Sequence, residues 1–212
     1  MLAANFEGAG HDARERFLRE HAEELYADLT DDYATPLRLD ELVYRAAERI
    51  PGLVPTRAQV EAEAERLQGE KEGAEIAQGL LIAHVLASPR AGSHLVWAML
   101  RPTELALEHL DELRTTGEVD LGGAHVRRDG VAGVLELRNP RHLNAEDAST
   151  LAATEAAVDL VLLDPEIEVG VFRGGVVDHP RYAGRRIFGA GINLTHLYRG
   201  LVPFLFYFVR DM

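Results

Sequence analysis

Near the end of the chain, the stretch Phe188-Gly189-Ala190-Gly191-Ile192 could perform chemistry through its backbone. It contains no side-chain nucleophile, so its reactive groups would be peptide N–H donors. Glycine lets backbone approach a ligand closely or adopt φ > 0, and N–H groups gathered before a helix attract negative charge. Such donors can form an oxyanion hole, which stabilises the charge that develops on a carbonyl oxygen. The alternative is a tight strand-to-helix turn with a packing role, because a lone G-x-G pattern has low specificity.

Arginines form the second group that could do chemistry, because the last part of the chain gathers several of them. Residues 121–212 carry 10 basic and 11 acidic residues, whereas residues 1–120 carry 12 basic and 24 acidic. The clustered side chains are Arg173, Arg181, Arg185, Arg186 and Arg199. A local basic patch on a chain of net charge −13 favours a small phosphorylated ligand and argues against general nucleic-acid binding. The alternative is that these arginines pair with acidic side chains of the first part.

Composition limits the remaining classes of function. The sequence has no cysteine, which excludes disulfides, thiolate metal sites and cysteine nucleophiles. Residues 1–10 lack the basic and apolar regions of a signal peptide, and the longest apolar run, Leu201–Val209, is too short to span a bilayer. The histidines of the first part are spaced too widely for a local metal motif. We therefore expect a soluble cytoplasmic protein without a metal or a membrane partner.

The first 115 residues predict helices and no strand. Apolar residues recur at three- and four-residue spacing, and Pro, Gly, Ser, Thr and Asp mark the ends. The expected helices are His11–Thr30, Leu39–Ile50, a third that starts after Thr56, Ala74–Ala87 and Pro102–Arg114. Ala74–Ala87 is apolar nearly throughout, which predicts that it is buried. Ser88-Pro89-Arg90 is interpreted as a break between helices.

The pattern changes after Gly117. Two β runs flank Asp129-Gly130, which is a good hairpin turn. A helix is expected over 144–163, and 168–174 reads as a compact buried strand before the glycine turn. This is an α/β pattern in which the carboxyl ends of strands and the amino ends of helices should meet at a ligand site.

Three segments together resemble the crotonase (enoyl-CoA hydratase/isomerase) superfamily, over roughly 121–200. They are Leu135–Ala145, Glu168–Gly174 and Phe188–Leu194. The resemblance implies a helical N-terminal domain over 1–118, followed over 119–212 by the first part of a crotonase-like ββα spiral fold that binds acyl-CoA. Crotonase-like proteins are usually trimers or dimers of trimers, so we expect a homo-oligomer of that kind, up to a hexamer.

The expected reaction is predicted from resemblance to a smaller group within this superfamily. The loop His179–Arg186, followed by the glycine turn and preceded by a long helical extension, is similar to the dioxygenases of this superfamily from glycopeptide antibiotic biosynthesis. These enzymes use neither metal nor organic cofactor. The resemblance implies oxidation of 3,5-dihydroxyphenylacetyl-CoA with O2 to 3,5-dihydroxyphenylglyoxylate and free CoA.

The same resemblance implies roles for individual residues. Gly191 and Ile192 would be catalytic, because the Ile192 N–H matches one oxyanion donor. The implied substrate-binding residues are Glu146, His179, Arg181, Tyr182, Gly189, Ala190 and Arg210; those implied to bind CoA are Arg141, Arg185 and Arg186. Glu146 would lie near the aromatic hydroxyls, although it is also a good residue for the first turn of a helix.

Two alternatives to the dioxygenase remain open in the sequence. One is another crotonase-superfamily reaction, namely hydration, isomerisation or thioester hydrolysis of a different acyl-CoA. The other is a non-catalytic helical assembly module joined to a partial CoA-binding fold. The second oxyanion amide of the superfamily has no match before Met212, and the aromatic run Val202–Val209 would leave apolar surface exposed at the end of the chain. We therefore expect 1–212 to be the front half of a longer enzyme.

Overall fold

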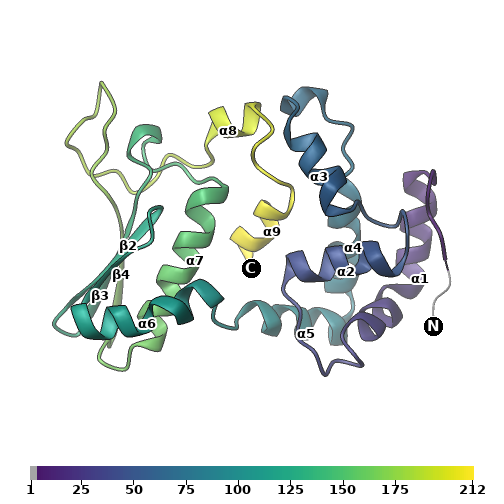
Figure 1. Cartoon of the computed structure of the whole chain (residues 1–212), viewed down its shortest axis with the longest axis horizontal. Helices are drawn as coiled ribbons and strands as arrows, with labels where there is room; N and C mark the ends of the chain where they lie inside the picture. Colours follow the sequence, from purple (N-terminus) through teal and green to yellow (C-terminus); the bar gives the residue numbers. More distant parts are fainter. Residues whose placement is uncertain (1–3) are drawn as a thin grey trace. The chain divides into compact units, whose positions relative to one another are not determined.

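The computed structural model describes residues 4–212 and divides them into two compact units (Figure 1). One unit contains the residues up to 101 together with 198–212, and the other contains 102–197. The helices are α1 (His11–Leu29), α2 (Leu39–Arg49), α3 (Arg57–Ala64), α4 (Ile76–Ala87), α5 (Pro89–Met99), α6 (Glu104–Thr116), α7 (Ala148–Leu163), α8 (Leu194–Tyr198) and α9 (Leu205–Asp211), with short 3₁₀ turns at Gln68–Glu70 and Pro140–His142.

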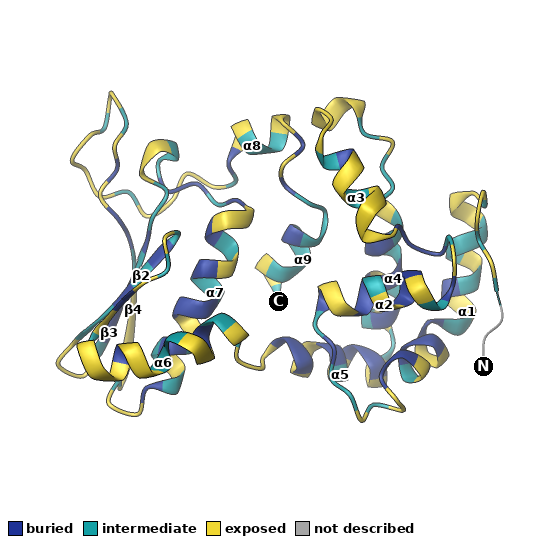
Figure 2. Cartoon of the chain, in the orientation of Figure 1, coloured by how far each residue is buried: buried dark blue, intermediate teal, exposed yellow. Residues whose placement is uncertain are grey.

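The helical unit is built around an apolar core. Its buried side chains come mainly from α1, α2, α4 and α5, and Figure 2 colours the buried positions dark blue. Thr56 accepts a hydrogen bond from the Gln59 N–H and caps α3, as the sequence predicts. The break expected at Ser88-Pro89-Arg90 is confirmed, because α4 ends at Ala87 and Ser88 caps α5, whose first position suits Pro89 since its missing N–H is not needed there. The sequence analysis did not predict α5 itself. Across residues 4–212, no helix combines the length and the apolar character that crossing a membrane requires.

The C-terminal segment 198–212 packs into the helical unit. Phe206 is 2% exposed, and Phe208 and Val209 of α9 pack against the apolar core. The Phe204 N–H donates to Glu75, which forms an ion pair with Lys71 at 3.3 Å. The expectation that the run Val202–Val209 would be left exposed is therefore wrong for much of it, because the helical unit covers these side chains.

The second unit contains a four-stranded sheet in the order β1-β2-β3-β4, with helices α6 and α7 packed against it (Figure 1). The strands are β1 (Glu118–Asp120), β2 (Ala124–Asp129), β3 (Ala132–Leu137) and β4 (Val169–Gly174). β1, β2 and β3 pair antiparallel, whereas β4 returns through α7 and pairs parallel with β3. The predicted hairpin is confirmed, since Gly130 has φ of +61° between β2 and β3.

The position of α6 differs from the sequence interpretation. Ala106 and Leu113 of α6 are fully buried in the same core as strands β1 to β3 and helix α7. This helix therefore belongs with the sheet, and the two compact units meet in sequence near residue 101 instead of residue 118. The division into a helical domain 1–118 and an acyl-CoA-binding domain 119–212 stays a prediction.

Strand β4 is less buried than the sequence predicts. Val169, Val171 and Phe172 are 54%, 41% and 45% exposed. The physical reason is that β4 forms one end of the sheet and, among residues 4–212, pairs only with β3. The interpretation of 168–174 as a buried strand is right about the strand and wrong about its burial.

Candidate functional site

A backbone bridge brings together Glu146 and Ile192, two candidate site residues that lie 46 positions apart in the sequence. The Glu146 N–H donates to the Gly191 carbonyl at 2.8 Å, and the Asn193 N–H donates to the Glu146 carbonyl at 2.8 Å. Glu146 and Ile192 therefore form an isolated parallel β-bridge. The entry to helix α7 and the glycine turn therefore lie side by side.

The bridge determines the direction of the Ile192 N–H. The Gly191 carbonyl and the Ile192 N–H belong to the same trans peptide group and point in opposite directions, and that carbonyl faces Glu146. The Ile192 N–H therefore points to the opposite side, and no group within residues 4–212 accepts a hydrogen bond from it. Ile192 is half-buried and Gly191 is exposed, so this donor is available to an incoming carbonyl oxygen.

The two glycines of the turn serve different purposes. Gly191 has φ of +77°, a conformation in which a side chain is strained. Gly189 has no positive φ; a Cβ built there would lie 3.3 Å from the Asn144 carbonyl oxygen, which is a tight contact. The prediction of φ > 0 is confirmed at Gly191, whereas Gly189 lies close to the protein's own backbone and close approach to a ligand stays a prediction. Ala190 lies between them and is exposed.

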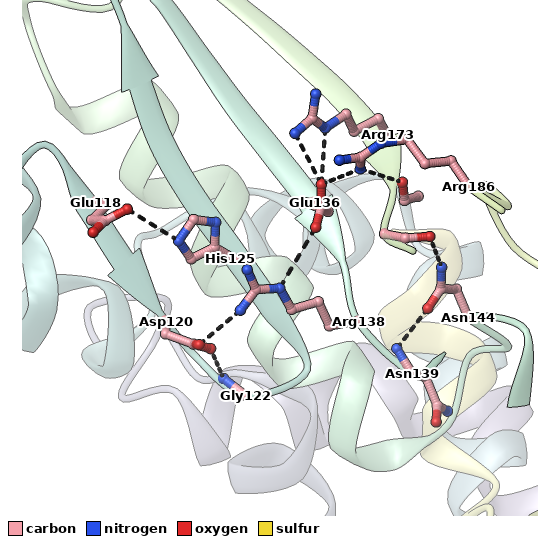
Figure 3. A network of polar contacts seen from close by, with 12 residues as sticks. Glu118, Asp120, Gly122, His125, Glu136, Arg138, Asn139, Asn144, Arg173 and Arg186 are labelled. Atoms are coloured by element: carbon pink, nitrogen blue, oxygen red, sulfur yellow. Dashed lines mark hydrogen bonds and ion pairs between the residues drawn. The ribbon is translucent and has the colours of Figure 1, made fainter. Parts of the chain in front are cut away.

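Asn144 fixes the path of the chain into the turn. It is 2% exposed, with φ of +55°, which Asn tolerates better than most residues. Its Nδ2 donates to the carbonyls of Gly175 at 2.9 Å and Ile187 at 2.8 Å. Its Oδ1 accepts from the Asn139 N–H at 2.8 Å, and Figure 3 shows this pair at the end of the network. One side chain therefore joins the loop after β3, the end of β4 and the segment that leads into the turn.

Asp147 joins the start of α7 to the segment after the turn. It is 1% exposed; its Oδ1 caps the helix by accepting from the Ser149 N–H at 3.1 Å. Its Oδ2 accepts from Asn139 Nδ2 at 3.0 Å and Asn193 Nδ2 at 2.9 Å, and it lies 3.1 Å from His196 Nδ1. Burial by itself raises the pKa of this carboxyl, but the hydrogen bonds from Ser149 and Asn193 outweigh it, so the pKa of Asp147 lies below its ordinary value.

Glu136 holds two of the arginines that the sequence analysis selects. Arg173 Nε and Nη2 lie 3.0 Å from Glu136 Oε2, and Arg186 Nη1 donates to the same oxygen, as Figure 3 shows. Burial raises the pKa of Glu136, yet the hydrogen bond and charge of Arg186, with those of Arg173, lower it below the ordinary value. The suggested pairing of these arginines with the acidic first part is wrong, because their partner lies on β3. The assignment of Arg186 to CoA stays a prediction.

The predicted loop around His179 is a closed hairpin beside Arg141. The Val177 N–H donates to the Arg185 carbonyl at 2.9 Å, and the Asp178 N–H donates to the Pro140 carbonyl at 3.0 Å. This second bond places the hairpin next to the turn that carries Arg141. Arg141 and Arg185 are exposed, and neither forms an ion pair with an acidic group of residues 4–212. Two guanidinium groups are therefore available to an anionic ligand at this loop.

The remaining predicted residues divide between the two units. His179 and Tyr182 stack with ring centroids 5.5 Å apart, and the Arg181 guanidinium lies 5.4 Å from the Tyr182 centroid. Arg210 lies on α9 in the helical unit, where it forms an ion pair with Asp211 at 3.1 Å. The binding roles of these four residues stay predictions.

Asn139, Asp147 and Asn193 were missed by sequence reasoning. Only Asp147 has a local signal, because an Asp directly before an apolar helix is a good N-cap. Nothing in the sequence near Asn193 indicates a partner 46 residues earlier.

One comparison with known proteins bears directly on this site. Over 199 residues the chain is 54% identical to a (3,5-dihydroxyphenyl)acetyl-CoA 1,2-dioxygenase of Amycolatopsis orientalis. The match covers 93% of this chain and 46% of that protein, so the chain spans less than half the length of this curated relative. No family model matches the chain.

Proposed function

We propose that this chain supplies the acyl-CoA-binding turn of a dioxygenase that oxidises 3,5-dihydroxyphenylacetyl-CoA with O2. The products are 3,5-dihydroxyphenylglyoxylate and free CoA, and the reaction uses neither metal nor organic cofactor. The observation that carries the proposal is the 54% identity over 199 residues to a protein named for this activity. The geometry supports it, because the Ile192 N–H is held next to Glu146 with its donor direction unoccupied within residues 4–212.

In the proposed reaction the Ile192 N–H donates to the thioester carbonyl oxygen. Loss of one α-proton then gives an enolate, whose negative charge the electron-rich ring and the backbone donor both stabilise. One such donor contributes about 2.7–4 kcal/mol to transition-state stabilisation in other enzymes. The half-buried Ile192 side chain limits water near the anion, which protects it from reprotonation.

The later steps balance without a further oxidant. The carbanion reduces O2 and forms a C–O bond, which gives a peroxide anion at the α-carbon. This peroxide attacks the thioester carbonyl and expels CoA as the thiolate. Cleavage of the O–O bond with loss of the second α-proton leaves the keto acid, so one oxygen atom enters the ketone and the other the carboxylate. One released proton ends on CoA.

The proposal assigns the surrounding residues as the sequence resemblance does. Glu146 contacts the aromatic hydroxyl region, and the loop that carries His179, Arg181 and Tyr182 approaches the CoA part of the substrate. Gly189 and Ala190 lie along the CoA chain, while Arg141, Arg185 and Arg186 approach its phosphates. We also propose a crotonase-like fold for the catalytic part, a trimer or dimer of trimers as the assembly, and a place in glycopeptide antibiotic biosynthesis.

The test is simultaneous measurement of O2 uptake and CoA release. The protein is expressed from its complete natural reading frame and given 3,5-dihydroxyphenylacetyl-CoA in buffer that contains a metal chelator. We expect one O2 consumed for each CoA released, with the arylglyoxylate as product. CoA release without O2 uptake would identify a thioesterase, and a changed acyl-CoA without CoA release a hydratase or isomerase. Binding of CoA without any turnover would favour the non-catalytic module.

A further inference from the structure

The carboxylate of Asp147 divides its hydrogen bonds between two tasks. Oδ1 faces the start of α7 and accepts from the Ser149 N–H at 3.1 Å and the Ser149 hydroxyl at 2.6 Å. Oδ2 accepts from Asn139 and Asn193 and lies 3.1 Å from His196 Nδ1. Capping alone would need one oxygen, which a serine or an asparagine can also provide. The second oxygen is therefore held for another purpose.

The position of the second oxygen connects it to the glycine turn. Asp147 directly follows Glu146, and Asn193 directly follows Ile192. The backbone bridge between Glu146 and Ile192 is therefore followed, one residue later on both segments, by the side-chain bond from Asn193 to Asp147. Asn193 is 2% exposed, so this bond is protected from competition by water. The two contacts together prevent Ile192 from rotating about the bridge.

We propose that Asp147 is a positioning residue, whose Oδ2 clamps Asn193 and thereby aims the Ile192 N–H at the substrate carbonyl. Two amide donors converge on this oxygen from the loop after β3 and the segment after the glycine turn, and the His196 ring of helix α8 lies 3.1 Å from it. They bring together the three segments that surround the turn. A shift of the donor by a fraction of an ångström weakens transition-state stabilisation more than binding, because the oxyanion forms only during the reaction.

Because Oδ1 and Oδ2 have different partners, a substitution can remove the Oδ2 acceptor while the cap on helix α7 stays in place. In Asp147→Asn, the amide oxygen can still cap α7, but the NH2 group would face the donors of Asn139 and Asn193. The exchanged pair Asp147→Asn/Asn193→Asp restores a donor–acceptor contact in the opposite direction. A matched control is Asp164→Asn at the other end of α7. Asp164 is also buried, and it accepts hydrogen bonds from Arg128 at 3.1 Å and from the Glu166 N–H at 3.0 Å, neither of which belongs to the glycine turn.

The experiment has a kinetic readout and an independent structural one. All variants are expressed from the complete reading frame, and kcat and KM are measured for O2 uptake with the arylacetyl-CoA. Hydrogen–deuterium exchange of peptides that contain the Glu146 and Asn193 amides reports the bridge itself. The kinetic part rests on the proposed function, whereas the exchange part does not. If the wild-type protein consumes no O2, the proposed function fails. The exchange data would still show whether Asp147 holds Asn193 and the bridge in place.

We expect Asp147→Asn to lower kcat about 10- to 100-fold with KM within about 3-fold, in line with partial loss of one oxyanion donor. The Glu146 and Asn193 amides should exchange at least about 10-fold faster, and the exchanged pair should recover most of both effects. Asp164→Asn should leave both readouts unchanged, whatever it does to the melting temperature. The proposal is overturned if Asp147→Asn leaves amide exchange unchanged, if the exchanged pair recovers neither effect, or if Asp164→Asn matches Asp147→Asn.

Discussion

The interior of the helical unit and the interior beside the glycine turn are built from different interactions. The helical core consists of aliphatic and aromatic side chains from α1, α2, α4 and α5. Beside the turn, three polar side chains are buried, those of Asn144, Asp147 and Asn193, and they form hydrogen bonds to backbone groups and, between Asp147 and Asn193, to each other. Apolar packing is non-directional and mainly stabilises, whereas hydrogen bonds require fixed directions. The difference indicates that one region supplies stability and the other supplies geometry.

A buried ion pair in the helical unit departs from this contrast, and it gives the largest expected effect. Lys71 and Glu75 form an ion pair in the helical unit with side chains only 5% and 8% exposed. Lys71→Met leaves the Glu75 charge buried without its partner, and we expect a loss of about 3–5 kcal/mol in the free energy of unfolding. Urea denaturation measures this loss.

The control for Lys71→Met is Glu72→Ala. Glu72 pairs with Arg66 at 2.9 Å, but its side chain is 79% exposed, so the expected cost is about 0–1 kcal/mol. Equal losses in the free energy of unfolding for the two variants would contradict this prediction, because they would show that burial does not strengthen the Lys71–Glu75 ion pair.

Asn144 gives the next largest effect and tests the polar region. Asn144→Ala removes three hydrogen bonds and leaves the Gly175 and Ile187 carbonyls without this donor. It also places alanine at φ of +55°. We expect a loss of about 2–4 kcal/mol in the free energy of unfolding, together with loss of most activity.

Asn144→Gly separates the two causes, because glycine adopts the same φ without strain. It should recover about 1 kcal/mol of stability relative to Asn144→Ala and recover no activity. Recovery of activity by glycine would mean that the hydrogen bonds of Asn144 do not align the turn.

Gly191→Ala is expected to have a smaller effect on stability and a large one on activity. A Cβ at this position meets no atom within 4 Å, so the cost is purely conformational and should be about 1–2 kcal/mol. Gly130→Ala is the matched control, because Gly130 also has φ > 0 and open space around it in the hairpin between β2 and β3. Similar losses in the melting temperature, with activity lost only in Gly191→Ala, would support the account. Equal activity in both variants would contradict it.

The smallest expected effect is a dependence of stability on pH. The pKa of Glu136 lies below its ordinary value of 4.5, so the folded protein holds this carboxylate ionised more readily than the unfolded chain does. Its contribution is fully present at neutral pH, above 4.5, and is lost as the pH falls from there through the lower pKa of the folded protein.

Urea midpoints measured from pH 7 to pH 3 test this dependence. The wild-type protein should lose stability below about pH 4.5 more steeply than Glu136→Gln does. Parallel pH profiles would show that Arg173 and Arg186 do not stabilise the Glu136 carboxylate.

Local patterns in the sequence predicted most elements but not their surroundings. The cap at Thr56, helix α1 and the hairpin at Gly130 follow from short-range rules that depend on a few neighbouring residues. Strand β1 was missed because three residues are too short for a periodic pattern. The burial of β4 was misjudged because burial depends on which elements lie beside a strand, and its own side chains do not encode that.

The candidate site shows the same limit. The glycine turn is visible in the sequence, since Gly191 is where a positive φ is required. Its proximity to Glu146 was implied only by resemblance to a family, because a contact between residues 46 positions apart produces no pattern among neighbouring residues. The carboxylate of Asp147 and the amide of Asn193 were not found at all, although they hold that bridge in place.

The most direct test of the account is a crystal structure with an unreactive arylacetyl-CoA analogue that keeps the acyl carbonyl group. The protein should again be expressed from its complete reading frame. The account predicts that the analogue's carbonyl oxygen lies about 2.7–3.1 Å from the Ile192 nitrogen, with the bridge to Glu146 intact. An analogue carbonyl bound elsewhere, or an Ile192 N–H that donates to another group of the protein, would contradict it.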